Sequence, residues 1–189
     1  MQTLETTDLH PPAVKRKRPA EHAIPSSFHD FKNLVLQTVY YLNSTKSKSV
    51  CIGYNPNGDF ESVVQFNQVG KKSVTVSQSE WVNILNCKEE ATLFFYKGEK
   101  HNLTSGLTYA NYFGKRHLVI KKSFNLNWDE WDALVKLYKL IDLFLQRLST
   151  SRDKVRHFLA TKLAKNITDC DFERLELEMV LITYGLANP

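Results

Sequence analysis

The sequence contains one short pattern twice, first as Val74-Thr75-Val76-Ser77-Gln78-Ser79-Glu80-Trp81-Val82-Asn83-Ile84-Leu85 and again as Phe124-Asn125-Leu126-Asn127-Trp128-Asp129-Glu130-Trp131-Asp132-Ala133-Leu134. Each copy opens with an apolar-polar-apolar triplet, which is typical of a half-buried strand. A helix-capping residue follows, and a glutamate three positions later completes a capping box. The matching positions are Ser77 and Asn127, Glu80 and Glu130, and Trp81 and Trp131 (131 − 81 = 50). The pattern predicts a strand that runs directly into a helix, in two related units.

Each copy has sequence ahead of it that predicts two further strands. In the first unit these strands are 50–54 and 59–67, joined by the turn Asn55-Pro56-Asn57-Gly58. In the second unit they are 91–97 and 107–113, and the third strand is 117–126, after the turn Gly114-Lys115-Arg116. Short connections favour antiparallel pairing. We therefore expect an α+β protein in which two tandem antiparallel sheet–helix units form a single-chain pseudodimer.

The N-terminal part differs in composition from this core. Residues 1–27 hold most of the prolines and little apolar pattern, which predicts a disordered arm. Within it, Lys15, Arg16, Lys17 and Arg18 precede a proline, a pattern typical of a nuclear import signal. The alternatives are a solvated charge run or an arm that contacts phosphate. Apolar residues at helical spacing predict a helix over 28–42, although its β-branched residues and the Tyr40-Tyr41 pair keep a strand open.

The C-terminal part is rich in helical pattern. A wide apolar stripe continues the Trp131 helix to Leu148, and Ser149-Thr150-Ser151 is expected to break it. A basic helix over 152–165 and a last helix through Tyr184, capped by Thr168 or Asp169, should follow. The predicted organisation is thus an arm over 1–27, a nucleic-acid-binding core with an N-terminal helix over 28–148, and a helical extension over 149–189. The extension either covers the sheets or presents a surface to a partner.

Composition narrows the function classes. The chain has 25 Lys and Arg against 20 Asp and Glu, and this excess of positive charge permits a polyanionic partner without requiring one. The three cysteines lack the spacing of a zinc site or a disulfide framework. No signal peptide, membrane-length apolar run, phosphate loop or nucleophile motif is present. We expect neither an enzyme nor a metal or cofactor site, and no contact with a membrane.

The repeated pattern resembles the end of the core domain of the positive cofactor four family, coactivators that bind single-stranded DNA. There, a strand of a curved antiparallel sheet leads through an Asn cap and an acidic or amide residue to a Trp on a helix. Residues 124–134 are similar to that passage, 74–84 match in the same register, and the tandem arrangement resembles the plant Whirly relatives. The resemblance spans about 50–148 and implies that Trp81 and Trp131 pack their helices on the sheets.

The resemblance also concerns the turns between the DNA-binding strands. Gly114-Lys115 after Phe113 is similar to the family's Phe and Gly-Lys turn, and Gly70-Lys71 after Phe66 is the first-unit counterpart. The chain departs from the family in a shorter loop between the middle strands and in lacking the serine-rich acidic N-terminal region. Nothing in the family corresponds to residues 151–189.

Single strands bind to basic grooves lined by aromatic side chains, each stacked base contributing about 1–3 kcal/mol. Residues of both types alternate around the predicted strands. The candidate nucleic-acid-binding residues are Lys71, Lys72, Tyr96, Lys97, Lys100, Tyr112, Lys115, Arg116, Lys121 and Lys122. Strand alternation places Tyr112 on the opposite face from Leu107 and Tyr109, and we expect that face to be open. In the alternative interpretation the aromatics are core residues and the lysines protect strand edges.

These observations predict a nuclear protein that binds single-stranded or locally melted DNA, in preference to RNA and without sequence specificity, and supports transcription or replication. An import receptor would be a second partner. The alternative is an interaction or dimerisation module that uses the C-terminal helices, also as a contact between copies, with the sheet as a scaffold.

Overall fold

The computed structural model describes residues 34–103, 106–164 and 172–185, and it is an α+β fold with two antiparallel sheets. One sheet has four strands in the order β1-β2-β3-β4, with bounds Val35–Tyr41, Lys48–Asn55, Glu61–Gln68 and Val74–Ser77. The other has three strands in the order β5-β6-β7, with bounds Leu107–Tyr112, Lys115–Ile120 and Phe124–Leu126. The helices are α1 Gln78–Asn86, α2 Lys88–Lys97, α3 Trp128–Ala164 and α4 Phe172–Thr183.

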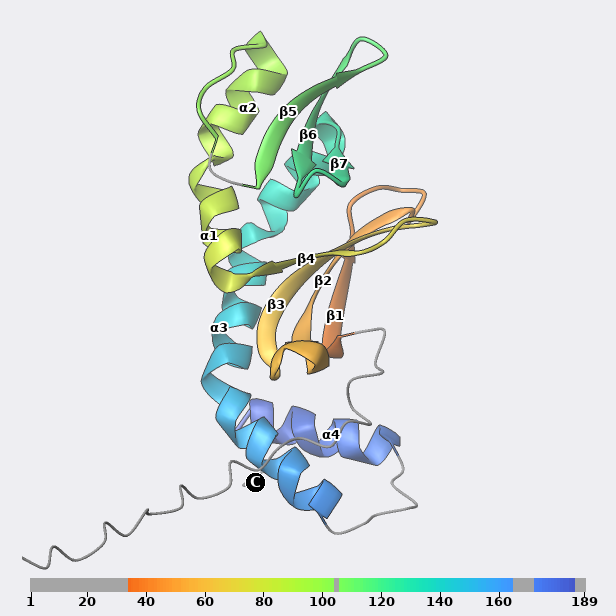
Figure 1. Ribbon diagram of the computed structural model, residues 1–189, viewed down its shortest axis with the longest axis vertical. Coiled ribbons are helices and arrows are strands. Elements are labelled where there is room, and N and C mark those ends of the chain that lie inside the picture. Colours follow the sequence, from red (N-terminus) through yellow and green to blue (C-terminus); the bar gives the residue numbers. More distant parts are fainter. Residues whose placement is uncertain (1–33, 104–105, 165–171, 186–189) are drawn as a thin grey trace, which may run out of the picture.

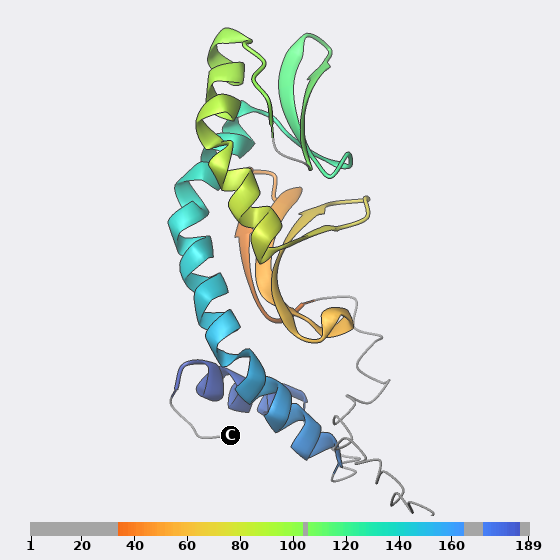
Figure 2. The ribbon, with the colours of Figure 1, turned by 60° about the vertical axis from the view of Figure 1, so that its left-hand side comes forward.

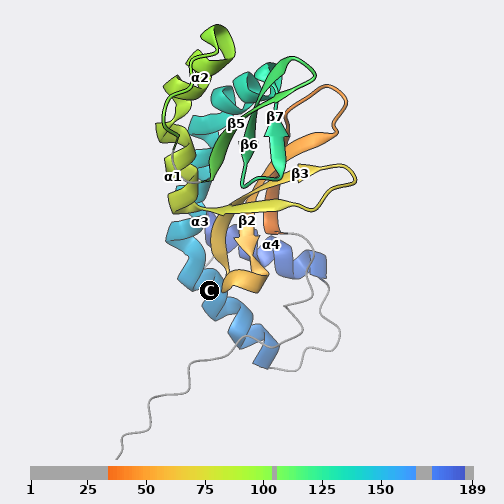
Figure 3. The same cartoon turned by 45° about the horizontal axis from the view of Figure 1, so that its top comes forward.

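The helices α1, α2 and α3 lie on one side of the two sheets (Figures 1, 2 and 3). Helix α3 runs alongside both sheets and contacts β2, β3, β6 and β7, and α4 packs on α3 and β1 (Figure 1). Most buried apolar residues of both sheets and of the described helices form one core, in which Phe66 of the first sheet meets Phe124 of the second at 5.1 Å between ring centroids. Leu34, Cys51 and Val63 form a small separate cluster. The hairpin tips point away from the helices (Figures 1 and 2).

The repeated pattern folds as predicted in both copies. Ser77 accepts a hydrogen bond from Glu80 N, and Glu80 accepts one from Ser77 N, so the first capping box is complete. Asn127 and Glu130 form the same pair of bonds at the start of α3. Trp81 and Trp131 are both fully buried. The prediction of a strand that enters a helix through a capping box is therefore confirmed at both positions.

The helix predicted over 28–42 is wrong within the described residues. Residues 35–41 form strand β1, which pairs antiparallel with β2. Its β-branched residues favour the extended state, and a register shift between Val35 and Thr38, with Leu36 at a φ of 51°, marks a bulge. Residues 28–33 lie outside the described part of the chain.

The strand predicted over 91–97 is also wrong, because this run lies in helix α2. Acidic residues in the first turn, Lys97 in the last turn and left-handed Gly98 after it are typical helix-end signals. Ala91 and Phe94, three positions apart, are buried, whereas Tyr96 is exposed. The single apolar run is therefore divided between the two sides of a helix.

Two further boundaries differ from the prediction. The strand predicted over 117–126 is two strands, β6 and β7, because Lys121 and Lys122 have φ angles of 46° and 60° and turn the chain. The break predicted at 149–151 is absent, since α3 continues to Ala164. Thr150 bonds to the carbonyl of Gln146 within the helix, and Ser151 donates to Thr183 O at the end of α4. The predicted caps Thr168 and Asp169 lie outside the described residues.

Candidate nucleic-acid interface

Two hairpin tips present the same residue pattern to solvent. The β3–β4 connection begins with Val69-Gly70-Lys71-Lys72. The β5–β6 tip has Phe113-Gly114, followed by Lys115-Arg116 at the start of β6. Both glycines have a φ of 74°, a backbone conformation that is strained for residues with a side chain. The space beside each glycine is open, so the backbone conformation and not crowding favours glycine here. The residue before each glycine is exposed, 76% for Val69 and completely for Phe113. Each tip therefore holds one exposed apolar side chain, a left-handed glycine and then two basic residues, of which Arg116 alone is half-buried.

Several of the predicted basic residues at or near these tips make no ion pair with the described residues. Lys71, Lys72, Lys115 and Lys122 are exposed, and none of them makes an ion pair with the residues that the structure describes. Lys46, in the β1–β2 tip, lies 5.4 Å from the ring centroid of exposed Tyr41. Lys71, Lys72, Lys115 and Lys122 can therefore move toward an anion without breaking an ion pair with the described residues.

Two predicted binding residues instead hold the fold together. Arg116 is half-buried and donates from Nη1 to Phe95 O at 2.5 Å, which fastens the end of α2 to β6. Lys121 donates to Thr75 O at 2.8 Å and forms an ion pair with Glu80 at 2.7 Å. A substitution at either position would alter stability as well as charge.

Three predicted residues lie on α2 or in the loop after it, and for two of them, Tyr96 and Lys97, the sequence predicts a strand instead of this helix. Tyr96 and Lys97 end the helix and Lys100 follows it, all of them exposed. Tyr96 is 68% exposed and its ring centroid lies 4.7 Å from that of Trp128, the residue that opens α3. These residues therefore lie toward the tip of the β5–β6 hairpin, where Arg116 contacts Phe95, on the helix side of the second sheet.

Tyr112 occupies the face of the second sheet that is turned away from the helices, as strand alternation predicts. It is 44% exposed and makes an edge contact with His117 at 5.2 Å between ring centroids. Tyr109, on the other face, packs on buried Phe94 at 4.3 Å. Burial lowers the pKa of His117 below its ordinary value, and the charges of Lys48 and Lys115 lower it further against the opposing effect of Glu130.

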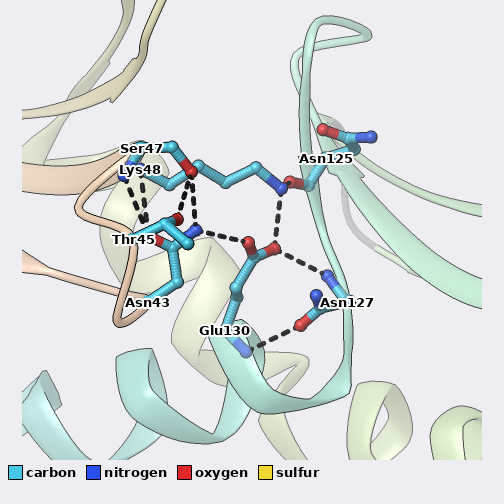
Figure 4. A network of polar contacts seen from close by, with 7 residues as sticks. All are labelled: Asn43, Thr45, Ser47, Lys48, Asn125, Asn127 and Glu130. Atoms are coloured by element: carbon cyan, nitrogen blue, oxygen red, sulfur yellow. Dashed lines mark hydrogen bonds and ion pairs between the residues drawn. The ribbon is translucent and has the colours of Figure 1, made fainter.

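The capping glutamate of each unit is bound by a lysine of the other unit. Lys48, which begins β2, donates from Nζ to Glu130 Oε2 and to Asn125 O, both at 2.7 Å (Figure 4). Asn43 donates to Glu130 Oε1 at 3.0 Å from the same side (Figure 4). The carboxylate of Glu130 therefore accepts from the first unit and from its own helix cap at once.

Lys121 makes the corresponding contact with Glu80 from the second unit. Both lysines bind the glutamate together with the carbonyl five residues before it, Asn125 for Glu130 and Thr75 for Glu80. Partial burial raises the pKa of Glu80, but the hydrogen bonds and charge of Lys121 and the bonds from Ser77 outweigh it, so that the pKa falls below its ordinary value.

The repeated tryptophans make reciprocal contacts across the helices. Trp81 donates from Nε1 to Asp142 Oδ1 at 2.7 Å, and Trp131 donates from Nε1 to Thr92 Oγ1 at 3.3 Å. The acceptors are also fifty residues apart (142 − 92 = 50). Between these contacts Lys88 lies 4.9 Å from the ring centroid of Tyr138, again fifty positions further on. Residues fifty positions apart in the sequence thus make matching contacts.

Comparison with models of protein families, with curated proteins and with solved structures returns no match to this chain. Among the described residues, no group of three or more His, Cys, Asp or Glu is placed to hold a metal ion. No helix in the described ranges is both long enough and apolar enough to cross a membrane.

Four residues that make these contacts are not among those predicted from the sequence: Lys48, Thr92, Trp128 and Asp142. Lys48 lies at the end of a run of Ser, Thr and Lys that is typical of a linker, although an apolar run begins two residues later at Val50. Trp128 had a usable signal, because it is the residue in which the second copy of the pattern differs most from the first, where Gln78 stands. Thr92 and Asp142 become visible only when the fifty-residue offset is applied to residues outside the pattern. The import residues Lys15, Arg16, Lys17 and Arg18 lie outside the described part of the chain.

Proposed function

We propose that this protein binds single-stranded or locally melted DNA through the hairpin tips and the sheet faces turned away from the helices. The observation that carries the proposal is the matching pair of tips, each with an exposed apolar side chain, a left-handed glycine and exposed lysine, Lys71 and Lys72 at one tip and Lys115 at the other. Aromatic side chains and mobile cations are the groups that hold single strands without sequence specificity. Tyr112, Phe113 and Tyr41 supply exposed rings near Lys115 and Lys46.

We further propose that the two sheet–helix units act as a single-chain pseudodimer. The reciprocal contacts of Trp81 and Trp131 with acceptors fifty residues apart support this arrangement. Lys48 of the first unit binds Glu130 of the second, and Lys121 of the second unit binds Glu80 of the first, which supports the arrangement as well. Lys48 and Lys121 are not fifty residues apart, so they do not occupy equivalent positions of the repeat. Their matching contacts therefore arose separately from the repeated sequence. Two related units side by side would give one strand two similar tips to contact.

Fluorescence anisotropy of labelled oligonucleotides tests the binding proposal. We expect affinity in the order single-stranded DNA, RNA, duplex DNA, and a loss of affinity with rising salt as counterions are released. The substitution Phe113→Ser, at a completely exposed position, should weaken binding and leave the melting temperature unchanged. The matched control is Leu143→Ser, at an exposed position of α3 on the helix side. Absence of salt-dependent binding to any oligonucleotide would reject the proposal.

The alternative function is a protein interaction module. It is favoured by Leu140 and Leu143, which are exposed on α3 although their neighbour Ile141 is buried. Within the described residues the C-terminal helices offer little apolar surface to a partner, because Val155, Leu159, Met179 and Ile182 are buried. We also propose that the protein is nuclear and that it is not an enzyme. We further propose that copies of the chain contact one another. Light scattering in the presence and absence of oligonucleotide tests that contact.

A further inference from the structure

A cavity of about 440 Å³ lies where the end of α2, the β5–β6 hairpin and the start of α3 meet. Its lining residues are Phe95, Gly114, Lys115, Arg116, Asn127, Trp128 and Asp129. Its volume is within the range of about 300–1,000 Å³ that is usual for small-ligand sites. The cavity touches the β5–β6 tip through Gly114 and Lys115, so that a strand held at this tip passes its entrance.

The lining combines aromatic and cationic groups. Trp128 makes edge contacts with Phe95 at 5.6 Å and with Tyr96 at 4.7 Å between ring centroids, and these contacts fix its indole. Arg116 is fixed as well, because its Nη1 is bonded to Phe95 O. Lys115 is exposed and free of ion pairs among the described residues, so it remains available for a phosphate.

We propose that this cavity receives one unstacked nucleobase of the bound strand, with Trp128 and Phe95 against the base and Lys115 on the adjoining phosphate. This inference rests on the proposed function and adds to it a base site outside the sheet face. The two cations disfavour a positively charged ligand, and the carboxylate of Asp129 disfavours an acidic side chain. A base has an apolar face and a hydrogen-bonding edge, and it matches a lining that contains both kinds of group.

Asp129 gives the site a selectivity. A carboxylate accepts hydrogen bonds from an exocyclic amino group, as Asp and Glu do from cytosine N4, and thymine has no such group. Asp129 is exposed and makes no ion pair with the described residues, so its oxygens remain available. The site should therefore prefer cytosine to thymine, and the protein should bind oligo(dC) more tightly than oligo(dT) of equal length.

The fluorescence of Trp128 can report whether this site is occupied. It has three tryptophans, of which Trp81 and Trp131 are fully buried and Trp128 is partly exposed. Titration with oligo(dC) of about 12 nucleotides should quench the Trp128 emission and protect it from acrylamide. The quenching should follow the same isotherm as anisotropy of the labelled oligonucleotide. Binding seen by anisotropy with unchanged emission and unchanged acrylamide access would overturn the base site and leave the proposed function intact.

Two variants complete the test. Trp128→Leu should lower the affinity for oligo(dC) at least about fivefold, the lower end of a single stacking contact. Asp129→Asn keeps the tryptophan and should bring the affinities for oligo(dC) and oligo(dT) together. Circular dichroism shows whether each variant is folded. If Trp128→Leu does not fold, the affinities of Asp129→Asn for the two oligonucleotides decide whether the base site exists. Wild-type affinity in folded Trp128→Leu, or an unchanged preference in Asp129→Asn, would overturn the inference. Failure to bind either oligonucleotide would reject the proposed function together with it.

Discussion

Lys48 and Glu130 form a buried ion pair with 2.7 Å between Nζ and Oε2, although 82 residues separate them in the chain. The pair joins the first strand of the four-stranded sheet's central hairpin to the first turn of α3. Burying two charges is costly, and this cost is offset only where the remaining hydrogen-bonding capacity is used. Asn43, Asn127 N and Asn125 O provide these partners, so the pair fixes the position of one unit against the other.

Lys48→Met should therefore destabilise the protein strongly. It leaves the Glu130 carboxylate buried without its cation, and the usual cost of removing one partner of a buried pair is about 3–5 kcal/mol. Urea denaturation measures this change. Lys46→Met, two residues earlier and exposed, is the control and should stay within about 0.5 kcal/mol of wild type. The double variant Lys48→Met with Glu130→Gln should be more stable than Lys48→Met alone, and equal stability would contradict the assigned charge coupling.

The two repeated tryptophans should have similar energetic weight. Trp81→Ala and Trp131→Ala each delete a fully buried indole and leave a cavity, which costs about 3–5 kcal/mol. Equilibrium unfolding followed by circular dichroism measures both values. A variant that melts within a degree or two of wild type would show that its tryptophan does not hold the helix on the sheet. Tyr96→Ala, at a largely exposed ring, is the comparison for loss of an aromatic at the surface.

Local signals were enough to predict the two strand-to-helix passages. Ser77 and Asn127 cap their helices through bonds that reach only three residues along the chain, so sequence spacing determines them. The run Leu93-Phe94-Phe95-Tyr96 misled the prediction, because four apolar residues in succession fit a buried strand as well as a helix. The decisive signals were outside the run, in Glu89 and Glu90 before it and Gly98 after it.

The contacts between the units could not be predicted in the same way. Lys48 pairs with a glutamate 82 positions away, and nothing near it in the sequence distinguishes it from solvated Lys46. For the candidate interface, the sequence indicated a basic and aromatic surface. It did not indicate which basic side chains bind other groups of the protein. Arg116 and Lys121 have the same residue types as their neighbours, and only the positions of Phe95 O and Glu80 show that they are structural.

The N-terminal basic cluster has a separate test. Replacing Lys15, Arg16, Lys17 and Arg18 with alanine should abolish nuclear accumulation of a large fusion protein, because an import receptor reads such clusters by charge. The melting temperature should be unchanged, since we expect the arm to bury nothing. Microscopy of the fusion and thermal denaturation of the purified variant measure the two effects. If the altered fusion still concentrates in nuclei, the import signal lies elsewhere in the chain.

His117 should make stability depend on pH. Its pKa in the folded protein lies below the ordinary value of 6.5, first because it is partly buried and then because Lys48 and Lys115 oppose a further positive charge, while Glu130 favours one. Above about pH 6.5 both states are neutral at this position and the full stability is present. As the pH falls, the unfolded chain takes up the proton first, so the free energy of unfolding decreases until the folded pKa is passed.

The variant His117→Gln isolates this effect. Urea midpoints measured between about pH 7.5 and 5.5 should fall less steeply for the variant than for wild type. All other ionisable groups are the same in both proteins, so their contributions cancel in the difference. Parallel pH profiles would show that protonation of His117 is not linked to unfolding.

Charge and stacking at the proposed interface should separate in a salt titration. Neutralising Lys71, Lys72, Lys115 and Lys122 to Gln removes exposed cations that make no ion pair among the described residues, so the fold should be unaffected. Each lost phosphate contact should reduce the magnitude of the slope of log K against log salt by about 0.7 for single strands. By contrast, Lys121→Gln should lower stability with little effect on that slope, because its ammonium is bound to Glu80 and Thr75 O.

Tyr112→Ala should behave in the opposite way from the lysine variants. It should cost about 1–3 kcal/mol of binding free energy with an unchanged salt slope, because stacking releases few counterions. Tyr109→Ala is the control on the same strand, and it should lower the melting temperature, because its ring packs on buried Phe94. If Tyr112→Ala loses stability and keeps its affinity, the ring belongs to the core. The binding face would then have to include the side of the sheet that carries Tyr109. If the lysine variants and Tyr112→Ala all bind as wild type does, the interaction-module function should replace the one proposed.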